Sequence, residues 1–115
     1  MIDFYVNSPS NESYLQRYAD LFTHLFFAIP ANQEAQDKTA AGVPVNLFRE
    51  EFTNVLTKKM PFSGSFHGNE MPYLLGAFFY GPFEFDDADR AFQSDLLAGF
   101  ISFVKTGSVN VLVVA

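Results

Sequence analysis

The stretch Pro61-Phe62-Ser63-Gly64-Ser65-Phe66-His67-Gly68-Asn69-Glu70-Met71-Pro72-Tyr73-Leu74-Leu75-Gly76 sets one histidine between two glycines and then runs into a proline–tyrosine pair. Gly64 and Gly68 let the backbone adopt conformations that are closed to residues bearing a Cβ atom. Residues 53–68 read as one long loop, and a loop of that length inside a small domain is usually functional or disordered. We therefore expect a shaped loop that presents His67.

A long helix is predicted before this loop. Its start is either Ser8-Pro9, with proline at the first helical position, or the capping-box spacing of Ser13 and Gln16. Apolar residues then recur at intervals of three and four, as one helix face requires: Leu15, Tyr18, Phe22, Leu25, Phe26 and Ile29.

The end of this helix is set by a proline. Pro30 should stop it, because the residue before a proline is pushed out of the helical region. The segment just before Pro30 is apolar almost all round, which predicts a buried element. The polar stretch 31–42 can continue as helix from Asn32 until Gly42 breaks it.

Strand composition occurs on both sides of the loop. Val43-Pro44-Val45-Asn46-Leu47-Phe48 reads as a strand, although Asn46 weakens that prediction, and residues 109–114 form a second, doubtful strand. Between them a helix should start at Asp86 or Asp87 and end at Lys105 and Gly107, with a stripe of apolar residues at 92, 96, 100, 103 and 104. Helices around one or two strands predict an α/β fold that is incomplete as a domain, because a sheet generally needs three or more strands.

Composition narrows the class of protein. Of the 115 residues 49% are hydrophobic, with 15 Phe and 5 Tyr, more aromatic surface than a globule of this size can readily bury. The net charge of −6 argues against nucleic acid, and the lack of cysteine excludes disulfides and thiolate chemistry. Neither a signal peptide nor an apolar run of about 18 residues is recognisable, so we expect a soluble chain, with Asn11 as a glycosylation sequon only on a secretory route.

The histidine stretch resembles the histidine motif of type-B carboxylesterases and cholinesterase-like proteins, in which Gly-x-x-His-Gly-x-Glu leads into Pro-Tyr-x-x-Gly. Three flanking features are similar to the same family and occur in the same order: the helix containing Asp20-Leu21-Phe22, the strand 43–48, and the final helix ending in Lys105-Thr106-Gly107. The resemblance covers roughly residues 14–110. It implies that residues 1–115 are a partial, C-terminal piece of an α/β-hydrolase domain.

The resemblance also implies a role for His67. A hydrolase histidine takes a proton from a serine and later returns it, and an imidazole with a pKa near ~6.5 suits that exchange. From residue type alone, His67 is more simply a loop histidine with ordinary hydrogen bonds, and the surrounding motif reverses that preference. His24, inside the predicted first helix, has no such motif and reads as a rim or core histidine.

Other candidate groups are weaker. The acidic residues at 84, 86, 87 and 89 lack calcium-loop spacing and are better explained as a helix start. Ser63 and Ser65 lie near His67 but lack the Gly-x-Ser-x-Gly elbow of a nucleophile, and Glu50 and Glu51 occupy the wrong place for the family's acid. No cofactor or metal is expected.

Three functions remain open. The first is a segment of a serine esterase that supplies the triad histidine and is inactive alone, its ester substrate being bound only when another segment or a partner chain brings the serine elbow. The second is an interaction module that self-associates, or binds another hydrolase, through Phe-rich faces. The third is a small hydrophobe-binding protein derived from an esterase.

Overall fold

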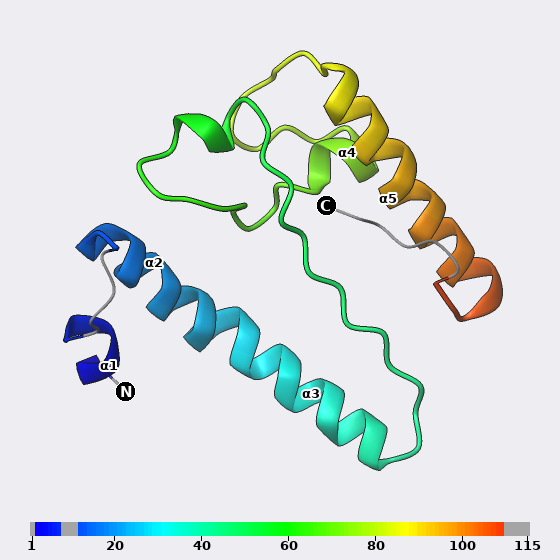
Figure 1. Cartoon of the computed structure of the whole chain (residues 1–115). Coiled ribbons are helices and arrows are strands. Elements are labelled where there is room, and N and C mark those ends of the chain that lie inside the picture. Colours follow the sequence, from blue (N-terminus) through cyan, green and yellow to red (C-terminus); the bar gives the residue numbers. More distant parts are fainter. Residues whose placement is uncertain (1, 8–11, 110–115) are drawn as a thin grey trace. The chain divides into compact units, whose positions relative to one another are not determined.

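The computed structural model describes residues 2–7 and 12–109, and helices with irregular connections make up this part of the chain (Figure 1). The chain divides into two compact units, Met1–Leu47 and Phe48–Ala115. The first unit contains α1 (Ile2–Val6), α2 (Tyr14–Thr23), the π-helical segment η1 (His24–Ala28) and α3 (Ile29–Ala40). The second contains the 3₁₀ turn η2 (Thr57–Lys59), α4 (Met71–Leu75) and α5 (Asp87–Thr106).

The start of α2 follows the later of the two predicted capping sites. Ser13 has extended backbone angles, and its hydroxyl accepts a hydrogen bond from the Gln16 N–H at 3.1 Å. This bond satisfies one of the backbone donors that a helix leaves unpaired at its first turn. The alternative start at Ser8-Pro9 lies outside the described residues.

The prediction that Pro30 ends the first helix is wrong. α2 runs through η1 directly into α3, and the three segments form one continuous rod (Figure 1). Proline lacks an N–H and its ring clashes with the carbonyl four residues earlier, so a helix tolerates it only if the preceding turn widens. The π-helical turn provides that widening, and the N–H of Ile29 bonds to the carbonyl of His24, five residues back. The side-chain amide of Asn32 donates a hydrogen bond to the Ala28 carbonyl at 2.8 Å.

The apolar segment just before Pro30, which the sequence predicts to be buried, is exposed in the structure. Leu25, Phe26, Phe27 and Ile29 are exposed, with Phe26 at 62%. The tilted rings of Tyr18, Phe22 and Phe26 contact one another along the rod, with successive ring centroids 4.6 and 5.4 Å apart. The apolar stripe that the sequence predicts is therefore present, but within residues 2–7 and 12–47 no element covers it completely.

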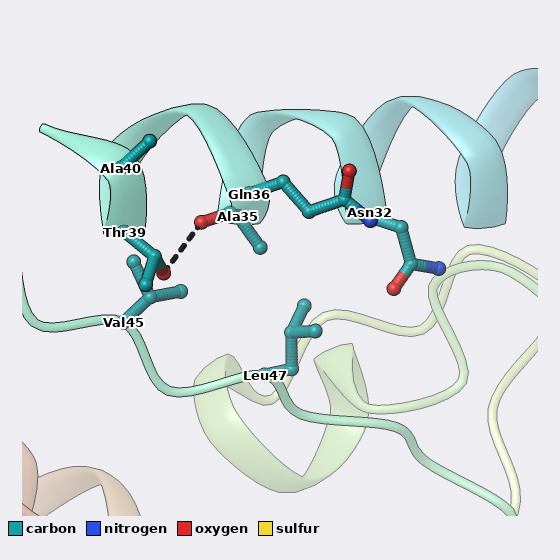
Figure 2. A pocket seen from close by; sticks show the side chains of 7 residues that line it. All are labelled: Asn32, Ala35, Gln36, Thr39, Ala40, Val45 and Leu47. Atoms are coloured by element: carbon teal, nitrogen blue, oxygen red, sulfur yellow. Dashed lines mark hydrogen bonds between the residues drawn. The ribbon is translucent and has the colours of Figure 1, made fainter.

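The strand predicted at 43–48 is absent. This segment has no regular secondary structure, and no strand occurs anywhere in residues 2–7 and 12–109. A strand exists only when its backbone groups pair with a neighbouring strand. Figure 2 shows Val45 and Leu47 turned instead toward an open groove along α3, lined also by Asn32, Ala35 and Thr39. The second predicted strand falls mostly outside the described residues, and Val109 is irregular.

The last predicted helix is confirmed at both ends. Asp86 caps α5 by accepting from the Asp89 N–H at 2.8 Å, and Asp89 accepts in return from the Asp86 N–H at 2.9 Å. Lys105 lies in the last turn, and Gly107 follows with φ of +73°. The acidic cluster is therefore explained in part by capping, as expected.

The core of the second unit is aromatic. Tyr73, Phe92 and Leu96 are buried, and a shell of partly buried residues packs around them: Phe52, Leu74, Phe83 and Phe85. The rings of Phe52 and Phe92 stack at 4.3 Å, and Tyr73 meets Phe92 edge-on at 4.9 Å. Only the first part of the α5 stripe enters this core, since Phe100, Phe103 and Val104 are exposed. The core fastens α4 against α5 (Figure 1).

Candidate functional site

His67 lies on a tight turn between the long loop and α4, and its side chain is exposed. The turn is closed by a hydrogen bond from the Asn69 N–H to the Phe66 carbonyl at 3.0 Å, and the Met71 N–H bonds to the Gly68 carbonyl at 3.1 Å. Gly68 has φ of +84°, in the left-handed region where side chains with a Cβ are strained. The expectation that glycine shapes this loop is confirmed.

Tyr80 restrains the backbone at His67. Its hydroxyl donates to the His67 carbonyl oxygen at 3.0 Å, and its ring packs edge-on against Phe66 at 4.5 Å. These contacts restrain the main chain, and His67 itself is an exposed residue. A histidine that must exchange protons needs this combination of a fixed backbone and an accessible ring.

Glu50 bonds to the loop on both sides of His67. One carboxylate oxygen accepts from the Ser65 hydroxyl, and the other accepts from the Asn69 side-chain amide at 3.3 Å. Burial raises the pKa of Glu50 above its ordinary value, while the bonds from Ser65, Asn69 and the Phe52 backbone oppose that rise. The carboxylate is thus a partly desolvated acceptor beneath the histidine turn.

A buried chain of hydrogen bonds continues inward from Asn69. Its side-chain oxygen accepts from Asn54 Nδ2 at 2.7 Å, and its amide also donates to the Phe52 carbonyl at 3.1 Å. Asn54 Nδ2 bonds further to the Tyr73 hydroxyl at 3.1 Å, and the Tyr73 hydroxyl donates to Asp89 Oδ1 at 2.7 Å. Asn54, Asn69, Tyr73 and Asp89 are each no more than 3% exposed. We call these four residues, with Glu50, the loop network.

The loop network reaches the first turn of α5. Asp89 is both the acceptor for Tyr73 and the second member of the α5 capping box. Burial, followed by the bond to Asp89, raises the pKa of the Tyr73 hydroxyl, so the phenol stays protonated and donates. Asn54 also holds the backbone at the start of η2, because its side-chain oxygen accepts from the Leu56 and Thr57 N–H groups at 2.9 and 3.0 Å. The histidine turn is therefore tied to the aromatic core.

Other sequence candidates lie apart from this arrangement. Glu51 forms a surface ion pair with Arg49 at 2.6 Å. His24 is exposed in η1 and hydrogen-bonds to the Tyr5 hydroxyl, so it is not a core histidine. In residues 2–7 and 12–109 no group of three or more His, Asp or Glu side chains could hold a metal ion.

Sequence reasoning missed the loop network. Asn54 and Asp89 carry no motif, and polar residues of their kind in loops and at helix starts usually serve as caps. The signal that could have found Tyr73 is its place in the Pro-Tyr-x-x-Gly run, where a tyrosine next to a buried proline needs a partner for its hydroxyl.

The histidine turn, its proline–tyrosine helix and the capped final helix occur in the order that the resemblance to type-B carboxylesterases predicts. The chain belongs to the carboxylesterase family, whose family model matches residues 1–112. Membership implies an α/β-hydrolase fold, whereas residues 2–7 and 12–109 form helices and loops without a strand.

Curated relatives are esterases. Gut esterase 1 of Caenorhabditis elegans is 29% identical over 93% of this chain and 21% of its own length, and gut esterase 1 of Caenorhabditis briggsae is 28% identical with the same coverage. Esterase cest-33 of Caenorhabditis elegans is 30% identical over 74% of this chain and 16% of its own length. The chain thus spans about a fifth of the length of these relatives. No solved structure matches it significantly, and no described helix is long and apolar enough to cross a membrane.

Proposed function

We propose that this chain is the histidine-bearing segment of a serine carboxylesterase, and that His67 acts as the general base and acid of ester hydrolysis. The observation that carries the proposal is the match to the carboxylesterase family across residues 1–112, with His67 exposed on a glycine-shaped turn. In acyl transfer the histidine takes the serine proton and then protonates the leaving group. That role requires a fixed backbone and an accessible ring.

The remaining catalytic groups come from outside residues 1–115 in this proposal. The sequence contains no Gly-x-Ser-x-Gly elbow, and Ser65 bonds to Glu50 instead of standing at a strand–helix turn. Without a nucleophile and oxyanion donors, a positioned histidine supplies little acyl-transfer catalysis. We therefore propose that the chain is inactive alone and acts within a longer protein or with a partner chain that carries the serine elbow.

Substituting His67 tests the role directly. In an assembly that contains the serine elbow, His67→Ala is expected to lower kcat for a short-chain p-nitrophenyl ester by about 10³-fold or more, because the serine then has no base. His24→Ala is the matched control, since it removes the chain's other histidine, and hydrolysis should persist. Undiminished turnover in His67→Ala would rule out the assignment.

A second candidate function has its own observation. The rod formed by α2, η1 and α3 presents a run of exposed large apolar side chains: Tyr14, Leu15, Tyr18, Phe22, Leu25, Phe26, Phe27 and Ile29. In soluble proteins, large exposed apolar patches mark interaction sites. A chain that is not completed by a serine-bearing segment would act through this surface as a non-catalytic interaction module, with self-association as the simplest outcome.

A further inference from the structure

The two contacts of Glu50 are arranged symmetrically about His67. Ser65 lies two residues before the histidine and Asn69 two residues after it, and each bonds to a different oxygen of the same carboxylate. One rigid planar group thus fixes the distance between the two ends of the histidine turn. A tie on one side only would leave the other end free to swing.

The surroundings of Glu50 make this tie stiff. Asn69 cannot rotate to follow a moving partner, because its amide also bonds to the Phe52 carbonyl and its oxygen accepts from Asn54. Glu50 itself is half-buried, so water competes less for its lone pairs than at the surface. Because Asn69 is held by buried hydrogen bonds and Glu50 bonds to it, the carboxylate restrains the histidine turn relative to the buried core.

We propose that Glu50 is a positioning residue for His67, holding the turn in its working shape through Ser65 and Asn69. This inference rests on the proposed function of His67. Glu50 is placed neither on substrate nor on the imidazole. It acts on the geometry of the loop, and catalytic geometry must be held within about 0.5 Å to be productive.

The test uses the longest natural form of the protein that contains residues 1–115. Glu50→Ala removes both bonds, and Ser65→Ala removes one with little change of volume. Glu50→Gln removes the charge but can keep both bonds, since its carbonyl can accept from Asn69 while its NH2 group donates to the Ser65 hydroxyl. Glu51→Gln is the matched control, because Glu51 is the neighbouring carboxylate and forms a surface ion pair with Arg49. Hydrolysis of a p-nitrophenyl ester and amide hydrogen exchange are measured for each variant.

Glu50→Ala is expected to lower kcat by about tenfold to a hundredfold with KM nearly unchanged, because misplacement of a catalytic group costs rate more than binding. Ser65→Ala and Glu50→Gln should fall between Glu50→Ala and the unmodified protein. Exchange of the Asn69 and Met71 amides, which close the turn, should accelerate about tenfold while the Leu96 amide of α5 stays protected. Glu51→Gln should change neither readout.

Hydrogen exchange separates this inference from the proposed function. If His67→Ala leaves hydrolysis intact, the base assignment fails. If His67→Ala abolishes hydrolysis while Glu50→Ala and Ser65→Ala leave kcat unchanged, the positioning role alone is overturned. Unchanged exchange at Asn69 and Met71 in Ser65→Ala overturns it too, even in a preparation without esterase activity or if Glu50→Ala does not fold.

Discussion

The hydroxyl of Tyr73 connects two buried polar residues within an otherwise aromatic core. It accepts from Asn54 and donates to Asp89, and all three are almost completely buried. Removing one partner from such a chain leaves a donor and an acceptor without hydrogen bonds in a region that water does not reach. The loss exceeds that of an exposed bond, since the desolvation penalty is no longer offset.

Tyr73→Phe is therefore expected to destabilise the folded protein by about 1–3 kcal/mol, with the ring still filling the core. Tyr80→Phe serves as its control, because the Tyr80 hydroxyl also donates one bond, to the His67 carbonyl, but on an exposed residue where water can replace it. Urea unfolding of the two variants gives the comparison. If both variants lost the same free energy of unfolding, the buried hydrogen bonds of Tyr73 would be no stronger than the exposed bond of Tyr80.

At the scale of elements, α5 depends on its first turn. Asp86 accepts the Asp89 N–H, and this hydrogen bond lowers the pKa of the Asp86 carboxyl below its ordinary value of 3.8. A lowered folded-state pKa means that the capping contribution is complete above the unfolded value and is lost as the pH falls through the folded one. The cap should therefore weaken only in acid.

Asp86→Ala is expected to lower the melting temperature by a few degrees at neutral pH, because the N-cap bond is lost. Asp86→Asn should retain most of the stability at neutral pH, since asparagine caps as well as aspartate, but should lose the acid-dependent part of the decline. Asp95→Ala, at an exposed position within α5, should cause no comparable fall. Thermal scans at neutral and acidic pH would contradict the capping role if Asp86→Ala and Asp95→Ala behaved alike.

The rod of α2, η1 and α3 shows how an element can contradict a strong local signal. Pro30 ordinarily stops a helix, yet here the preceding π-helical turn absorbs its ring and its missing N–H. The residue pattern gives no hint of this turn. Proline position alone therefore predicted the wrong boundary at Pro30, while the predicted stop near Gly42 was correct.

At the scale of the whole molecule, apolar surface exceeds what the described fold covers. Large apolar side chains are exposed in both units, from Phe26 in η1 to Val104 at 81% in α5. Burial of such surface is worth roughly 25 cal/mol per Å², so a chain without a covering partner gains by associating with itself.

We expect the 115-residue chain, prepared by itself, to self-associate or to unfold without a sharp transition. Its mass by sedimentation should rise with concentration, and Phe26→Ser should shift the equilibrium toward monomer by removing an exposed ring from the rod. Gln33→Ser, a polar and exposed position on α3, is the control and should not. A sharply unfolding monomer at all concentrations would refute the expectation.

The shape of the histidine loop and part of the fold could be predicted from sequence. Glycine spacing around His67, the Ser13 cap and the ends of α5 depend on contacts within a few residues, and the structure confirms each. The strand at 43–48 could not be judged in this way, because a strand requires a partner segment, and none pairs with these residues in the described part of the chain. The predicted burial of the first helix was wrong for the same reason, because burial also requires a partner segment and its apolar side chains are exposed in the described part of the chain.

The sequence by itself determined the family, the histidine turn and the local punctuation of the helices, because caps, left-handed glycines and a contiguous motif act over short distances. Only the tertiary structure decided that Glu50, Asn54, Tyr73 and Asp89 converge around the base of that turn. These residues are separated by up to several tens of positions along the chain. Their meeting is fixed by packing of the aromatic core, and core packing leaves no short-range pattern in the sequence.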